Sequence, residues 1–151
     1  MPKLSNKINI ENRRAKFDYQ FLETFTAGLV LKGTEIKSIR EGKANLNESY
    51  CYFKNNELYI KNMHITEYSE ASFYNHEPMR ERKLLLNKQE LNKLLKKVKD
   101  LGLTIIPIRL FINDKGFAKL DIALSKGKKM FDKREDIKKR DIEREVGRKL
   151  K

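Results

Sequence analysis

The sequence predicts a mainly β fold, namely a small antiparallel barrel of about six strands with two or three short helices and a basic C-terminal tail. Short runs of branched and aromatic residues are separated by Asn- and Gly-containing turns, and they do not alternate with helices in β-α-β order. Positive charge is concentrated at the end of the chain, where residues 125–151 contain twelve Lys and Arg against six Asp and Glu.

The first half of the chain begins with a long strand and a short helix. Residues 19–32 are rich in aromatic and branched side chains, and Ala27-Gly28 in their middle indicates a bulge or a sharp bend. Residues 33–42 predict a helix with Thr34 as N-cap and Gly42 at its end. Its expected buried side holds Ile36 and Ile39, and its basic side holds Lys37 and Arg40, with Lys43 just beyond.

A hairpin follows this helix. Residues 49–53 and 57–60 predict two short strands around the turn 54–56, because Asn tolerates the positive φ that such turns require. Residues 63–68 are expected to form a further strand, and residues 69–82 are expected to form a loop.

The next segment predicts the longest helix. Asn87 and Glu90 form a capping-box pattern at its start, and Gly102 is expected to end it. The lysines on the other face of this helix are interpreted as solvent-exposed residues that only keep that face hydrated. The apolar stripe of this helix consists of Leu91, Leu94, Leu95, Val98 and Leu101.

Residues 103–112 and 117–124 predict a final hairpin, because apolar and polar residues alternate in both. The residues expected to face the core are Ile106, Ile108, Leu110 and Ile112 in the first strand and Ala118, Leu120, Ile122 and Leu124 in the second. Six strands without β-α-β order favour an antiparallel barrel, and the oligonucleotide-binding type is the commonest basic example.

Composition indicates the kind of partner. A net charge of +13 and a pI near 9.8 favour phosphate-rich partners. The sequence has no apolar run of membrane-spanning length and no secretion signal, so we expect neither a membrane span nor export. The single cysteine, Cys51, is expected to be a buried strand residue rather than a reactive thiol, and it fits a reducing cytoplasm.

We expect three segments: a mobile N-terminus (1–11), a barrel domain (12–124) and the basic tail (125–151). The tail has acid-first i, i+4 pairs such as Glu135/Lys139 but too narrow an apolar stripe for a core helix. It is therefore expected to be disordered to helical when free and to order on an acidic polymer, nucleic acid first. The alternative is a solvated tail without function.

No enzymatic site is evident. His64 is interpreted as a partly buried strand residue, and His76 either caps a turn or contacts RNA. The sequence contains no phosphate-binding glycine loop, no CxxC and no clustered carboxylates for metal ions, so we expect no enzyme activity, no metal and no cofactor. Near the N-terminus, three cations lie beside Phe17 and Tyr19, a pattern that suits RNA, although both rings could equally begin a strand and pack inward.

Five blocks, in order, are similar to the SsrA-binding protein family (small protein B, SmpB), and the similarity runs from about residue 10 to 140. The blocks are Asn12-Arg13-Arg14-Ala15, residues 33–40 (GTEIKSIR), residues 42–46 (GKANL), residues 82–87 (RKLLLN), and Gly127-Lys128-Lys129 followed by Asp132-Lys133-Arg134.

This resemblance implies an oligonucleotide-binding-type barrel that binds the tRNA-like domain of transfer-messenger RNA, with a tail that reads the vacant decoding site and mRNA path of the small subunit of stalled ribosomes. Elongation factor Tu and alanyl-tRNA synthetase act on the same RNA, and a monomer in the cytoplasm is implied. The implied RNA-binding residues of the body are Asn12, Arg13, Arg14, Lys37, Arg40, Lys43, Asn45, Leu85, Leu86 and Asn87. The implied ribosome-binding residues of the tail are Gly127, Lys128, Lys129, Phe131, Asp132, Lys133 and Arg134.

Two of the implied residues, Leu85 and Leu86, could either contact RNA or support the site by packing. The chain departs from the family pattern at Thr26, where the family usually has Glu. Two other functions remain open from the sequence: a structural ribosomal or RNA-chaperone component, which composition alone favours, and an RNA-processing enzyme, for which no residues are evident.

Overall fold

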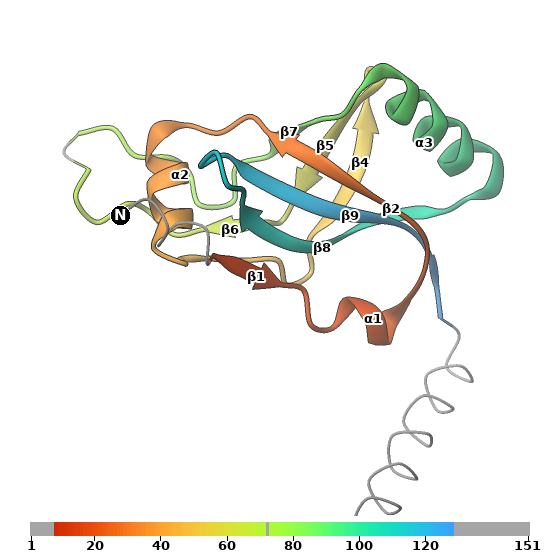
Figure 1. Ribbon diagram of the computed structural model, residues 1–151, viewed down its shortest axis with the longest axis horizontal. Coiled ribbons are helices and arrows are strands. Elements are labelled where there is room, and N and C mark those ends of the chain that lie inside the picture. The colour runs from red at the N-terminus through yellow and green to blue at the C-terminus, as the bar shows by residue number, and fades with distance from the viewer. Residues whose placement is uncertain (1–7, 72, 129–151) are drawn as a thin grey trace, which may run out of the picture.

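The structure, a computed structural model, describes residues 8–71 and 73–128 and contains an antiparallel barrel (Figure 1). Six strands are joined in a closed ring in the order β8-β4-β5-β7-β2-β9, and β9 pairs again with β8. Closure leaves the ring without a free edge and encloses one hydrophobic core. The strands of the ring are β2 (Tyr19–Leu29), β4 (Tyr50–Lys54), β5 (Glu57–Lys61), β7 (Arg82–Leu85), β8 (Thr104–Ile112) and β9 (Ala118–Gly127).

The remaining elements lie around this ring. Strand β1 (Asn9–Glu11) pairs with β8, and β3 (Ala44–Asn45) pairs with β6 (His64–Ile65). The described residues form three helices, which are α1 (Ala15–Asp18), α2 (Gly33–Arg40) and α3 (Lys88–Leu101). The predicted fold class, a mainly β barrel of about six strands with two or three helices, is confirmed.

The long strand β2 changes partners at Gly28. It pairs with β9 from Tyr19 to Gly28 and with β7 through Gly28–Leu85 and Leu29–Leu84. A Cβ atom on Gly28 would lie 3.4 Å from Cβ of Leu85, so the absent side chain allows the two strands to approach closely. The strand thus changes partners at the predicted position, but its register irregularity lies between Phe21 and Glu23 and not at Ala27-Gly28.

The β4–β5 hairpin has the predicted two strands and an Asn-Asn turn. Asn55 and Asn56 both have positive φ, 53° and 63°, as a two-residue turn between twisted strands requires. Cys51 is buried, as predicted, and burial raises the pKa of its thiol. Such a thiol is inert rather than reactive.

The β8–β9 hairpin is confirmed, with one correction. All four residues predicted to face the core from β9 are buried in it. In β8 the register shifts between Pro107 and Arg109, so Ile108 lies at a bulge and the inward alternation restarts after it. Leu110 and Ile112 belong to the core as predicted, and Ile106 is buried as predicted. Ile108 is only half-buried, so its assignment to the core was wrong, and Ile105 joins the core instead.

The capping box of α3 is confirmed, since the Asn87 side chain accepts from the Glu90 amide at 2.9 Å. Gly102 ends the helix with φ of 64°. Leu94 is fully buried. The predicted apolar stripe was one residue too long at its C-terminal end, because Leu101 is 65% exposed.

Several boundaries differ from the sequence prediction. Residues 9–11, predicted to be mobile, form β1. Residues 15–18 form the helical turn α1 before the long strand begins. Strand β7 begins at the last residue of the predicted loop 69–82, and β9 continues to Gly127, three residues beyond the predicted strand end at residue 124. Residues 1–7 and 129–151 lie outside the described residues.

Candidate RNA-binding surface

A groove of about 410 Å³ lies where α2, the end of β7 and the β8–β9 turn meet. Three cations line it: Arg40 of α2, Lys115 of the turn and Lys119 of β9. Apolar side chains form its floor and walls, and they are Leu29, Leu31, Ile36, Leu85 and Phe117. Leu85 and Phe117 are 49% and 63% exposed, so the groove presents apolar surface to solvent.

A hydrogen bond connects two of the elements that form the groove. Nη2 of Arg40 donates to the carbonyl of Gly116 at 3.4 Å, which joins α2 to the β8–β9 turn. On the floor, the absent side chain of Gly28 leaves room for Leu85 and for the ammonium of Lys119, which lies 3.7 Å from the position of a Cβ there. The groove thus combines cations for phosphates with exposed apolar surface for unstacked bases.

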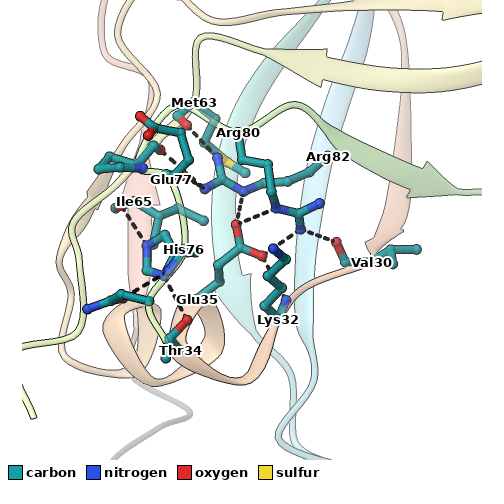
Figure 2. Close-up of polar contacts among 12 residues, drawn as sticks. Val30, Lys32, Thr34, Glu35, Met63, Ile65, His76, Glu77, Arg80 and Arg82 are labelled. Carbon is teal, nitrogen blue, oxygen red and sulfur yellow. Dashed lines mark hydrogen bonds and ion pairs between the residues drawn. The ribbon is translucent and has the colours of Figure 1, made fainter. Parts of the chain in front are cut away.

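A buried ionic cluster holds α2 in place (Figure 2). Glu35 is fully buried, and its carboxylate accepts from the Lys32 amide at 2.7 Å and from Nη2 of Arg80 at 2.6 Å. It also accepts from Nε of Arg82, whose guanidinium is likewise fully buried. Arg82 in turn donates to the carbonyl of Met63 at 2.6 Å. Lys32, not the predicted Thr34, is the N-cap residue of α2.

The cluster joins one carboxylate of α2 to two guanidinium groups from a second chain segment. Burial alone would raise the pKa of Glu35, but hydrogen bonds from Arg80, the Lys32 amide and Arg82 outweigh it and keep that pKa below its ordinary value. Burial lowers the pKa of Arg82, while the hydrogen bond to Glu35 raises it. An arginine with an ionised carboxylate as partner stays protonated, so the cluster is ionic.

His76 fastens the 66–81 loop to the same helix. Its ring is 2% exposed, and Nε2 lies 2.8 Å from the carbonyl of Ile65. Because a carbonyl only accepts, Nε2 bears the proton, and in the neutral ring Nδ1 accepts from the Thr34 hydroxyl at 2.9 Å. The side chain therefore links α2 to β6 within the fold, and it does not cap a turn as interpreted from the sequence.

The structure separates the residues that the resemblance assigned to one RNA face. Arg40 and Leu85 line the groove, and Lys37 is exposed on the same helix, 5.5 Å from the ring centroid of Tyr68. Lys43 and Asn45 are exposed beyond the end of α2. Leu86, by contrast, packs against the core.

Two asparagines have structural roles. Asn12 is buried, and its Nδ2 donates to the carbonyl of Pro107 at 2.9 Å, so it fastens the N-terminal segment to β8. Asn87 caps α3 with its side-chain oxygen. Asn12 is mostly buried but also lines the cleft beside α1, and its assignment to the RNA face stays a prediction.

Arg13 and Arg14 lie at the other end of the barrel. Both are exposed beside α1, where Tyr19 pairs with Gly127 and the Lys128 amide donates to the carbonyl of Asp18 at 2.9 Å. Figure 1 shows α1 at the point where β9 ends, and α2 near the opposite end of β9. Ten strand residues separate these ends by about 30 Å. The residues predicted to form one RNA face therefore lie at two ends of the barrel.

Among the tail residues assigned to the ribosome, Gly127 and Lys128 are described, and the others lie outside the described residues. Thr26 is exposed, and its hydroxyl donates to Oδ1 of Asp121 at 2.6 Å. Oδ2 of Asp121 accepts from Nε of Arg109 at 2.7 Å. A carboxylate is thus present beside Thr26, on the neighbouring strand.

The groove residues that the sequence prediction missed are Lys115, Phe117 and Lys119. The signal for them was present, because Phe117 and Lys119 alternate with the core residues of β9 and so face outward. In the described part of the chain, no three His, Cys, Asp or Glu side chains lie together as a metal site would require. No helix of that part is long and apolar enough to cross a membrane.

Comparison with known proteins identifies the family. Residues 9–151 match the family described as SmpB protein. The SsrA-binding protein of Christiangramia forsetii is 60% identical over 145 residues, which cover 96% of this chain and 92% of that protein. The SsrA-binding protein of Phocaeicola vulgatus is 61% identical over 144 residues, covering 95% and 96%.

A match to a solved structure indicates the same family as these sequence matches. That structure is described as "tmRNA-SmpB: a journey to the center of the bacterial ribosome", and its matching chain is 47% identical with a TM-score of 0.68. The match covers 82% of this chain and 86% of the solved one. By sequence over nearly its whole length and by fold, this chain belongs to the SmpB protein family.

Proposed function

We propose that this chain binds the tRNA-like domain of transfer-messenger RNA and delivers that RNA to stalled ribosomes for trans-translation, as an adaptor without enzymatic turnover. The observation that supports this most is the groove, in which Arg40, Lys115 and Lys119 surround exposed apolar side chains. Relatives that cover almost the whole chain are described as SsrA-binding proteins.

The groove has the chemistry for a folded RNA with an unpaired loop. Its cations neutralise phosphates, which provides most of the affinity and makes it dependent on salt. Leu85 and Phe117 offer apolar and aromatic surface to bases that have left a helix. Lys37, Lys43 and Asn45 extend this surface along and beyond α2.

The opposite end of the barrel is proposed to face the ribosome. Arg13, Arg14 and Lys128 lie there, at the start of the tail. The tail, including Lys129, Phe131, Asp132, Lys133 and Arg134, is proposed to occupy the vacant decoding site and mRNA path of the small subunit. The protein would act as a monomer in the cytoplasm, on an RNA that elongation factor Tu and alanyl-tRNA synthetase also use.

Two matched lysine variants test the groove. Lys119→Ala removes a groove cation, whereas Lys96→Ala removes an exposed lysine of α3 outside the groove. We expect Lys119→Ala to weaken binding to the tRNA-like domain and to flatten the plot of log affinity against log salt by about 0.7–0.9, the slope of one phosphate contact. Lys96→Ala should change neither quantity. Equal losses in both variants would mean that the RNA attracts the whole basic surface and not the groove.

A further inference from the structure

A row of three tyrosine rings lies on the outer surface of the β4–β5 hairpin. Tyr52 of β4 is paired with Tyr59 of β5, and their ring centroids are 6.3 Å apart. Tyr50 lies 6.2 Å from Tyr52 along the same strand. The tyrosines face outward, because the residues that alternate with them are buried in the core, namely Cys51, Leu58 and Ile60.

Open space borders the row at two places along β4, both on the side of β8. A cleft of about 640 Å³ beside α1 is lined by Tyr50 together with Arg14 and Tyr19. A hollow of about 370 Å³ between β4 and α3 is lined by Tyr52. Thr104 lines both, so the two spaces adjoin. Tyr50 is 36% exposed, and a planar ligand can reach its ring from the cleft.

Cations surround the row. Arg14 lies in the cleft, and Nζ of Lys54 is 5.9 Å from the ring centroid of Tyr59. Lys61 lies opposite Tyr50 and Lys83 lies opposite Tyr59 on the neighbouring strands. Lys99 lines the hollow between β4 and α3.

Carboxylates also lie near these cations. Arg14 pairs with Asp18 at 3.3 Å, Lys54 with Glu81 at 3.9 Å and Lys83 with Glu57 at 3.1 Å. Each cation in these pairs is at least one third exposed, and exposed pairs of this kind contribute little stability. A phosphate can therefore replace the carboxylate as partner at little cost.

We propose that this tyrosine row binds a short single-stranded stretch of ribosomal RNA. Adjacent rings accept bases of any sequence, and flanking cations accept the phosphates between them, which is how barrels of this type hold unpaired nucleic acid. The row starts in the cleft beside α1, where the tail leaves the barrel, at the opposite end of β9 from the groove. The choice of ribosomal RNA over transfer-messenger RNA rests on the proposed function.

Tyrosine fluorescence tests the row directly, because the chain contains no tryptophan. The probe is a short oligouridylate titrated into the full-length protein. We expect Tyr50→Ser/Tyr52→Ser to weaken binding about fivefold or more, the low end of a base–aromatic stacking contribution. Tyr52→Phe keeps the ring and should bind like the wild type. Tyr74→Ser is the matched control, since Tyr74 is 90% exposed in the loop between β6 and β7.

Two further measurements identify the RNA. The double variant should bind purified ribosomes more weakly than the wild type, while its affinity for the tRNA-like domain stays within about twofold, as expected for a site on a separate surface. Unchanged oligouridylate binding, or an equal loss in Tyr74→Ser, would overturn the row as a binding site. A loss confined to the tRNA-like domain would overturn its assignment to ribosomal RNA. The proposed function fails by a different result, namely a wild-type protein that does not bind the tRNA-like domain.

Discussion

Replacing Glu35 with glutamine should destabilise the fold more than any other single removal of a carboxylate in the described chain. Glu35 and Arg82 are both fully buried, and Arg80 is the second guanidinium on the same carboxylate. Glu35→Gln leaves two guanidinium groups without a counter-charge and turns an amide NH₂ toward their N–H donors. Breaking a buried pair in this way costs about 3–5 kcal/mol. That is a large part of the roughly 5–15 kcal/mol that stabilises a typical domain.

Urea unfolding measures this cost. With a slope of about 2 kcal/mol per molar urea, the midpoint should fall by roughly 2 M. The control is Glu23→Gln, which also removes a carboxylate held by two cations. Glu23 bonds Lys93 at 2.5 Å and Lys97 at 3.0 Å at the surface between β2 and α3. Because these side chains are 30–49% exposed, its loss should cost about 1 kcal/mol or less.

The reasoning is refuted if the two variants lose the same stability. That result would mean that water or a rearranged loop solvates Arg82 as well as the carboxylate does. A second readout is RNA binding under conditions where Glu35→Gln is folded. Because Glu35 holds the helix that bears Arg40, affinity for the tRNA-like domain should fall although Glu35 is buried and does not line the groove.

Three other outcomes are expected. Contacts in the fold keep the pKa of Glu35 below its ordinary value of 4.5. The contribution of Glu35 to stability is therefore complete above pH 4.5 and is lost as the pH falls through the lowered pKa. The stability of Glu35→Gln in urea should consequently depend less on pH below 4.5 than that of the wild type. Asn87→Ala should cost about 1 kcal/mol in urea unfolding, because it removes the cap of α3. Gly28→Val should weaken binding to the tRNA-like domain, because its methyl groups would displace Leu85 or Lys119 in the groove; unchanged binding would show that the floor of the groove is not in contact with RNA.

Much of the fold was predictable where local patterns and tertiary packing agree. The Asn55-Asn56 turn, the capping box of α3 and the alternation of β9 depend on neighbours in sequence, and all three are confirmed. The bulge at Ile108 was not predictable from alternation, because it depends on how β8 must bend to pair with β4, β9 and β1.

The site was only partly predictable from sequence. The resemblance indicated Arg40 and Leu85, and both line the groove. The separation of the groove from Arg13 and Arg14 could not be predicted from the sequence pattern, because barrel closure decides which chain segments meet. The role of Arg82 was hidden for another reason: a charged residue in a strand is normally exposed, and its partner Glu35 lies 47 residues away.

The central claim is that the barrel binds the RNA and the tail reads the ribosome, and one truncation tests it. The cut belongs after residue 128, because Ser125 is buried and Gly127 pairs with Tyr19. We predict that residues 1–128 bind the tRNA-like domain nearly as tightly as the full chain across a salt series, and that they fail to support tagging of a stalled product. A truncated protein that loses the RNA altogether would show that the tail is an ordinary basic arm, and it would contradict the account.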